Sequence, residues 1–510
     1  MKKLAILLAI LFLTPAFAVV NFPYPQEQAY AYGTYQGNMS NKVKTKFQSF
    51  YSDYYEESGD YARIKFDEGA YTVSEGIGYG MIMMVYFSDD DKSYQSEFDK
   101  LWNYYQHWSD GNGLMNWKIN GFNSVVGQNA ATDAEFDVAF SLIMAYYQFG
   151  DEKYKTAAQG ILAKIRAYEM ESDGLHKPGD TWNSSRNPSY VSPAAFELFK
   201  NFDNANVWAT AITRNYTLLK ANQNSTTGLP SGWSDDSGNP VNGTASSIQY
   251  DWDAPRAPWR WAWSYAWYGH SDALNLLSKL GSWLNNKSAN DLKIPMNLDG
   301  SNGQYNNSTA VGPFACAMMH SSSYASKRES FANALLNINE SSYFSAAMQI
   351  LTGLLLSGNM QNFAAMTPGN NSSSSSAVVN PTSSASDGTT SVIDDFEDGN
   401  NIANTGLEDY WYVFTDSGND GNSTITNEKE DGEYVVVSSA FAKDSDYGVG
   451  MKGIVLNKGD NVNNPYVTLG LNVEGGLAGC KTFSYDYKGA AHNFKVVMEE
   501  IGRASCRERV

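Results

Sequence analysis

The chain of 510 residues has little cysteine, a deficit of positive charge and no long apolar run. Its three cysteines, Cys316, Cys480 and Cys506, form no CxxC pair and no Cys/His metal spacing, so neither a disulfide framework nor a zinc site is expected. Lys and Arg number 36 against 55 Asp and Glu, and the net charge of -19 argues against nucleic acid and anionic membranes as partners. A neutral polymer is compatible with such a surface.

The N-terminus has the pattern of a secretory signal peptide over residues 1–18. Lys2 and Lys3 precede an apolar run, 4–13, and Ala16-Phe17-Ala18 matches the small-x-small cleavage pattern. The apolar run is too short for a membrane anchor, which needs about 20 residues. We therefore expect a soluble, secreted protein, extracellular or periplasmic.

A segment rich in Ser, Thr, Asn, Pro and Gly at 367–391 has the composition of a flexible linker. It separates an N-terminal domain, 19–366, from a C-terminal domain, 392–500. The last ten residues, 501–510, place three Arg in an otherwise acidic chain and match a translated sequencing adapter. We interpret them as an artefact that truncates the C-terminal domain.

The N-terminal domain is predicted to be helical throughout, because apolar residues recur with the helical period in twelve stretches. Short links between them indicate consecutive antiparallel pairs, and six such pairs can close into a ring. The even-numbered helices include the most apolar ones and are expected to line the inside. The stretches are 41–58, 75–88, 91–108, 131–149, 151–170, 192–203, 206–221, 255–269, 271–286, 306–320, 324–338 and 342–357.

The C-terminal domain changes to short β-rich runs separated by Gly, Asn and Asp. This pattern predicts an all-β sandwich. The runs are 410–414, 434–438, 454–457, 467–473, 483–487 and 494–498.

Three acids, Glu75, Asp133 and Asp253, lie where the second, fourth and eighth helices are expected to begin. In a closed ring of antiparallel pairs the inner helices run parallel, so these acids should converge at one end. Each acid alone could instead be a helix cap. Glycines at 76, 78 and 80 are unfavourable inside a helix by roughly 1 kcal/mol each, and we interpret them as room for a sugar chain.

Paired carboxylates are the groups that glycoside hydrolysis requires. One must carry a proton for the leaving oxygen, and the other must be ionised to activate water. A helix N-terminus favours the ionised form of Asp253. Burial and the charge of Asp133 should raise the pKa of Glu75.

The segments SEGIGYGM, ATDAEFDVAFSLIMAYYQFG and DAPRAPWR resemble the hallmark segments of glycoside hydrolase family 8. The resemblance runs from residue 21 to about 360. It implies an (α/α)6 barrel and an inverting mechanism, with Glu75 as general acid and Asp253 as general base. It also implies that Asp133 contacts the sugar at the cleavage site and that Arg256 lies beside the base. Two positions depart from the family pattern, because Glu135 replaces the usual Asp and Ile77 replaces a frequent Gln.

Aromatic side chains are expected to form the sugar subsites, since pyranose rings stack on them. Trp117, Tyr190, Trp259 and Tyr79 are the candidates, and each could instead be a core aromatic. Arg256 completes the predicted substrate-binding set.

The C-terminal domain resembles carbohydrate-binding modules with a galactose-binding-like β-sandwich. Such modules often hold structural calcium, for which the acids at 394–398 could supply oxygen ligands, although a solvated acidic turn is the alternative. No cofactor is expected for catalysis and no metal in the catalytic domain. The predicted protein is a monomeric, inverting endo-β-1,4-glucanase acting on β-glucan or xylan. The alternatives are a xylanase or reducing-end oligoxylanase of the same family, or a non-catalytic polysaccharide-binding protein.

Overall fold

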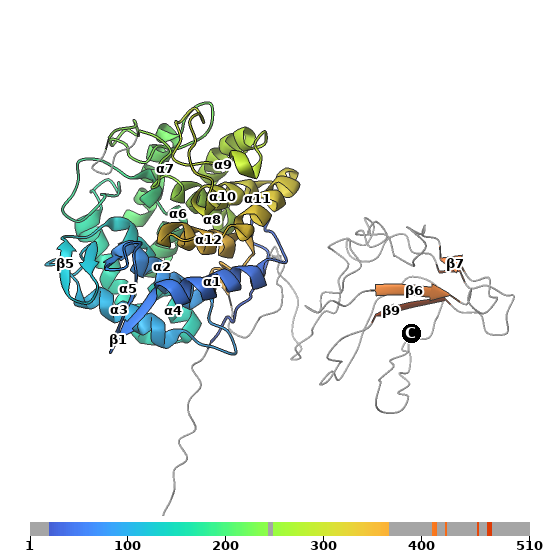
Figure 1. Cartoon of the computed structure of the whole chain (residues 1–510), viewed down its shortest axis with the longest axis horizontal. Helices are drawn as coiled ribbons and strands as arrows, with labels where there is room; N and C mark the ends of the chain where they lie inside the picture. The colour runs from blue at the N-terminus through green and yellow to red at the C-terminus, as the bar shows by residue number, and fades with distance from the viewer. Residues whose placement is uncertain are drawn as a thin grey trace, which may run out of the picture. The chain divides into compact units, whose positions relative to one another are not determined.

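The structure is a computed structural model that describes residues 20–242 and 248–366 fully, together with the backbone of four short strands between 411 and 471 (Figure 1). The chain separates into two compact units, Met1–Val379 and Asn380–Val510, at a point within the predicted linker. The signal peptide, the linker, the acidic cluster at 394–398 and residues 501–510 lie outside the described residues. No described helix is long and apolar enough to cross a bilayer.

Within residues 20–242 and 248–366 the structure has twelve α-helices, and each corresponds to one of the predicted stretches. The expected pairing is visible at Gly150, whose left-handed φ of 70° ends one helix directly before Asp151 caps the next. The helices are α1 (Ser40–Tyr54), α2 (Ser74–Tyr86), α3 (Gln95–His107), α4 (Thr132–Phe149), α5 (Glu152–Lys164), α6 (Pro193–Asp203), α7 (Val207–Asn222), α8 (Arg256–Tyr268), α9 (Ser271–Leu284), α10 (Ser308–Ala317), α11 (Ala325–Asn337) and α12 (Tyr343–Leu356).

The even-numbered helices form the inner ring. Each contacts the next even-numbered helix, from α2 through α4, α6, α8 and α10 to α12, and α12 contacts α2 to close the ring. Burial agrees with this position, since every residue of α2 except Glu75 is buried, as is all of α10. The odd-numbered helices bury one face only, as α3 and α9 do, and form the outer layer (Figure 1). This arrangement is consistent with an (α/α)6 barrel.

The domain is not helical throughout, because two small antiparallel sheets occupy its loops. Strands β1 (Tyr55–Ser58) and β2 (Tyr61–Ile64) form a hairpin where the first helix was expected to continue. Strands β3 (Tyr71–Val73), β4 (Lys118–Asn120) and β5 (Ser124–Gly127) form a three-stranded sheet.

The three-stranded sheet fixes the start of α2. Val73 pairs with Lys118 across the β3–β4 ladder, and the next residue, Ser74, begins the helix. The backbone N–H of Ser74 donates to the carbonyl of Trp117 at 3.0 Å. Glu75 and Trp117 are therefore held close together by backbone pairing.

The glycines of α2 serve helix packing, which corrects the interpretation that they admit a sugar chain. A Cβ on Gly76 would lie 3.1 Å from the Tyr343 hydroxyl, and one on Gly78 would lie 3.1 Å from Cβ of Asp137. A Cβ on Gly80 would lie only 2.8 Å from Cγ1 of Ile64. The space beside each glycine is already filled by this chain.

Four short strands are described in the second unit. β6 (Trp411–Thr415) pairs antiparallel with β9 (Val467–Leu471), and β7 (Thr424–Ile425) pairs with β8 (Leu456–Asn457). Three of the four overlap predicted runs. The β-sandwich as a whole stays a prediction.

Candidate active site

The three predicted acids meet at one end of the barrel, although they are far apart in sequence. Glu75 and Asp133 are the second residues of α2 and α4. Asp253 precedes α8, which begins at Arg256, so this acid lies in the turn before the helix rather than in its first turn. The convergence predicted from parallel inner helices is present in the structure.

A single buried guanidinium joins the three carboxyls. Nη1 of Arg256 donates to Oε2 of Glu75 and to Oδ2 of Asp133, both at 2.6 Å. Nη2 donates to Oδ1 of Asp253 at 2.9 Å. Because one cation stands between the acids, Glu75 and Asp253 are held apart on different nitrogens of the same planar group.

The loop before α6 positions Arg256. Oγ of Ser189 accepts from Nε of Arg256 at 3.1 Å and itself donates to Oδ1 of Asn187 at 2.7 Å. The backbone carbonyl of Asn187 contacts Nε2 of the buried His176 at 3.0 Å. Burial lowers the pKa of His176 to about 4, so its ring is neutral at neutral pH and serves this scaffold. The Tyr190 ring lies 5.1 Å from the Arg256 guanidinium and covers it.

Glu75 has the environment of a protonated carboxyl near neutral pH. Burial is the largest influence and raises its pKa to about 7, against the opposing charge of Arg256; Asp133 raises it further. Oε1 accepts a hydrogen bond from the Tyr343 hydroxyl at 3.0 Å. The predicted direction of the shift and its two causes therefore agree with the structure.

Asp133 is the most enclosed of the three acids. Burial raises its pKa to about 6, while Arg256 acts in the opposite direction. Beneath it, Arg260 and Asp137 form a buried pair with two hydrogen bonds of 2.9 and 2.8 Å. This pair links α8 to α4 one turn below the site.

Asp253 is the acid most open to water. Its side chain is 29% exposed, against 16% for Glu75 and 6% for Asp133. The indole of Trp233 donates to Oδ2 at 3.1 Å, and Arg256 donates to Oδ1. Asp251 holds the backbone of the turn, since its Oδ1 accepts from the N–H of Asp253 at 3.0 Å. Asp253 thus has two side-chain donors and access to water, which is the position that a base acting on water requires.

The predicted aromatic residues separate into exposed and buried sets. Trp117 is 43% exposed beside the start of α2, and Tyr190 is nearly buried against Arg256. Trp259 and Tyr79 are fully buried, and Trp259 stacks on Trp263 with 6.0 Å between ring centroids. Their burial places them in the barrel core, which corrects the expectation that they form sugar platforms.

Sequence reasoning missed several side chains of the site. Trp252 and Tyr305 are 43% and 57% exposed and stack with 6.1 Å between centroids, next to Asp253. Tyr343, Trp233 and Ser189 donate to or accept from the charged groups. Only Tyr343 carried a usable signal, because it begins the sixth inner helix, α12, at the same end of the barrel as Glu75.

The model of glycosyl hydrolases family 8 matches residues 22–358 of the chain. The match spans the whole ring of helices and all three acids. The chain belongs to this family.

Individual members of the family agree with the assignment. The chain is 30% identical over 368 residues to endoglucanase 2 of Ruminiclostridium josui, covering 68% of this chain and 78% of that protein. The apo structure of a β-1,3-1,4-glucanase from Paenibacillus sp. X4 superimposes with a TM-score of 0.64 at 28% identity, over 66% of this chain and 98% of that one. A reducing-end-xylose releasing exo-oligoxylanase shares the fold, with a TM-score of 0.56 at 20% identity over 63% and 93% of the two chains. The chain is a glycoside hydrolase of family 8 with a helical barrel.

Proposed function

We propose that the protein is an inverting endo-β-1,4-glucanase in which Glu75 is the general acid and Asp253 the general base. The observation that carries the proposal is the pair of unlike carboxyls on one guanidinium. Glu75 has a pKa of about 7 and keeps its proton near neutral pH. Asp253 accepts from Arg256 and Trp233 and is open to water.

In the proposed reaction, Glu75 transfers its proton to the glycosidic oxygen as the bond to the anomeric carbon breaks. Asp253 takes a proton from a water molecule, whose oxygen attacks the same carbon from the opposite face. The net change is the addition of one water, with inversion at that carbon. The proton left on Asp253 returns to Glu75 through solvent.

Asp133 and Arg256 support the reacting pair. Asp133 is held by Arg256 in a position to bind sugar hydroxyls and to stabilise the positive charge that develops on the ring. Arg256 also keeps Glu75 from moving towards Asp253, because it binds the two acids at once.

A neutral β-glucan is the proposed substrate, and the relatives support it. Endoglucanase 2 of Ruminiclostridium josui and the Paenibacillus β-1,3-1,4-glucanase are named for glucan cleavage. Trp117 and the stacked pair Trp252 and Tyr305 are exposed and offer ring faces on which a sugar chain can lie. Xylan is the second candidate, since xylose lacks only the hydroxymethyl group and an exo-oligoxylanase has the same fold.

The remaining features of the chain complete the proposal. Residues 1–18 would direct secretion, residues 367–391 would link the barrel to a carbohydrate-binding module at 392–500, and the enzyme would act as a monomer. A non-catalytic polysaccharide-binding protein is the alternative from another class. The acid, the base and the arginine that bridges them are all present, which favours catalysis.

The test is reducing-sugar release from carboxymethylcellulose, mixed-linkage β-glucan, xylan and chitosan by the full chain and by Glu75→Gln. We expect glucan cleavage with early loss of viscosity, and a loss of about 10²–10⁴-fold in Glu75→Gln. Glu329→Gln, at an exposed position on α11, is the matched control and should keep full activity. Near-normal turnover of unactivated glucan by Glu75→Gln would remove the acid assignment. If the protein cleaved xylan alone, xylan would replace β-glucan as the proposed substrate.

A further inference from the structure

A second pair of carboxyls, Glu135 and Glu169, is fully buried behind the site and has no part in the proposed reaction. Glu135 lies in the first turn of α4, two residues after Asp133. Glu169 ends the π-helical turn, Ile165–Glu169, that follows α5. The two side chains face each other between these elements and influence each other's ionisation.

The surroundings of this pair contain unused polar atoms and no counter-charge. Oε1 of Glu135 accepts from the Tyr105 hydroxyl at 2.9 Å. Its Oε2, both carboxyl oxygens of Glu169 and Oγ1 of Thr132 have no hydrogen-bond partner of normal geometry among the described residues. Within residues 20–242 and 248–366, no Lys, Arg or His forms an ion pair with either carboxyl.

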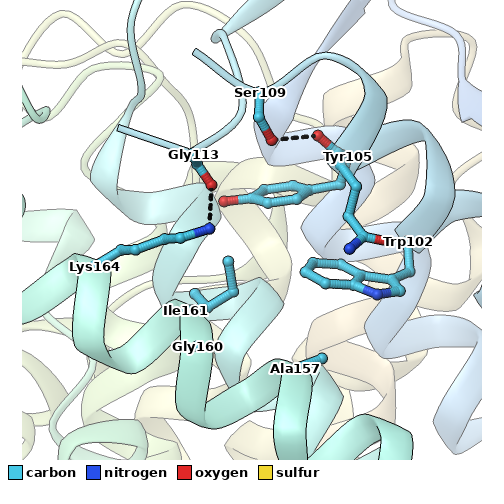
Figure 2. A pocket seen from close by; sticks show the side chains of 9 residues that line it. Trp102, Tyr105, Ser109, Gly113, Ala157, Gly160, Ile161 and Lys164 are labelled. Carbon is cyan, nitrogen blue, oxygen red and sulfur yellow. Dashed lines mark hydrogen bonds between the residues drawn. The ribbon is translucent and has the colours of Figure 1, made fainter. Parts of the chain in front are cut away.

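Solvent does not reach the pair, because neither residue has any exposed surface. A pocket of about 310 Å³ lies between α3 and α5, and Tyr105 stands in its wall beside Trp102 and Lys164 (Figure 2). The amine of Lys164 donates to the carbonyl of Gly113 at 2.8 Å. The one cation among the residues that line this pocket is therefore bound to its rim, and Tyr105, which also lines it, bonds to Glu135 through its hydroxyl.

Two neighbouring carboxylates cannot both be charged in such a setting. Burial raises the pKa of both groups well above the usual range, and the charge of Glu169 raises that of Glu135 further. The titratable groups that face them are Tyr105 from α3, Asp133 from α4 and Asp180 from the loop beyond the π-helical turn. All three are neutral or acidic, so a proton is the only positive charge that this cluster can hold.

We propose that Glu135 and Glu169 share one proton and act as a positioning pair, which places a single buried negative charge behind Asp133. The acid form of one donates to the carboxylate of the other, and Tyr105 fixes the orientation of Glu135. The pair joins the first turn of α4 to the π-helical turn after α5, and thereby holds Asp133 against Arg256. Its single charge also makes ionisation of Asp133 and Glu75 harder, an effect that rests on the proposed function.

Glutamine substitutions test how many negative charges the pair carries. Glu169→Gln and Glu135→Gln each replace an acid partner by a neutral amide that can donate the same hydrogen bond, so one negative charge remains. The double variant removes that charge. We expect the pH profile of kcat/KM on soluble glucan to be unchanged in both single variants. In the double variant we expect both limbs to move to lower pH by about half a unit, because the site carboxyls ionise more easily.

Stability gives a second readout that does not depend on activity. Above the unfolded pKa of about 4.3 for Glu, the folded wild type keeps a proton that the unfolded chain has released. Its stability must therefore fall as pH rises through this window, until the folded pair also ionises. The single variants have no such proton, so the urea midpoint of the wild type should fall relative to theirs with each pH unit. Glu329→Gln is the control and should show a constant gap.

The outcomes of these two experiments decide how many protons the pair of Glu135 and Glu169 holds. A shift of the pH profile in each single variant about half as large as in the double variant would mean two charges, and no shift in any variant would mean two protons. Either result overturns the shared proton, as does a constant stability gap. Both single variants are measured so that the test still stands if one of them misfolds. An enzyme that fails the Glu75→Gln test but shows this fall in relative urea midpoint would lose the proposed function and keep a buried carboxyl pair that holds a proton.

Discussion

The hydrogen bond from Tyr343 to Glu75 should control the alkaline limit of activity. The phenolic hydroxyl donates to Oε1 at 3.0 Å and stabilises the ionised form of Glu75, which lowers its pKa. Tyr343→Phe removes the donor and little else, because the ring stays in place between Gly76 and the neighbouring aromatics. The pKa of Glu75 should therefore rise.

The magnitude follows from the strength of the bond. A hydrogen bond to a charged group contributes about 1.5–3 kcal/mol, and 1.36 kcal/mol corresponds to one pKa unit. Because the Glu75 side chain is 16% exposed, water can replace part of the lost bond, and we expect the lower end of the range. From a starting value of about 7, the alkaline limb should move up by about one pH unit. A weaker acid also transfers its proton more slowly, so kcat at the optimum should fall by up to about tenfold.

The assay is kcat/KM on soluble glucan over a range of pH that covers both limbs. Tyr86→Phe is the matched control, since it loses an equally buried hydroxyl on α2, bonded at 2.7 Å to the carbonyl of Gln361, far from any carboxyl of the site. Its limbs should not move. An alkaline limb of Tyr343→Phe that stays in place or moves down would refute both the role of this bond and the assignment of the limb to Glu75.

Three further predictions concern stereochemistry, stability and domain structure. Fresh product from β-linked glucan should appear first as the α-anomer by proton NMR, and Asp253→Asn should trap no glycosyl-enzyme; an initial burst of β-anomer would contradict the base role of Asp253. Asp137→Asn leaves the buried Arg260 without its counter-ion and should lower the free energy of unfolding by about 3–5 kcal/mol in urea. The control Asp272→Asn, whose partner Lys220 is exposed, should change it by less than about 1 kcal/mol, and equal losses would refute the argument. The isolated segment 19–366 should fold and cleave soluble glucan; an insoluble or inactive product would show that the domain boundary is wrong.

The ring and its acids could be predicted because they depend on periodicity and on helix direction. Twelve amphipathic stretches give alternate inner and outer helices, and parallel inner helices bring Glu75 and Asp133 to one end. Asp253 was expected at the N-terminus of the eighth helix, and Ala254 and Pro255 form the turn between it and the first residue of α8, Arg256. The carboxyl still reaches the site, because only two residues separate it from the arginine that binds it.

Packing partners could not be predicted, because they come from distant segments. The glycines of α2 were interpreted as sugar contacts, whereas Tyr343, Asp137 and Ile64 fill the space beside them. In the sequence, a helical run of tryptophans has the same pattern whether the side chains line the cleft or pack in the barrel core. Burial is what assigns Trp259 to the core, while Trp252, in a loop, is exposed.

The balance of charge at the site explains why one acid must keep its proton. Three carboxyls share the single guanidinium of Arg256, so full ionisation would leave two uncompensated negative charges at the mouth of an apolar barrel. The second arginine, Arg260, is already neutralised by Asp137. The N-termini of α2 and α4 offset part of the remaining charge, but their effect is confined to the first turn.

A retained proton removes one charge, and it belongs on Glu75, whose pKa of about 7 exceeds the value of about 6 for Asp133. Asp253 has two side-chain donors and the greatest access to water, so it is the carboxyl best placed to take a proton from a water molecule. The same arginine thus sets which carboxyl donates a proton and which accepts one.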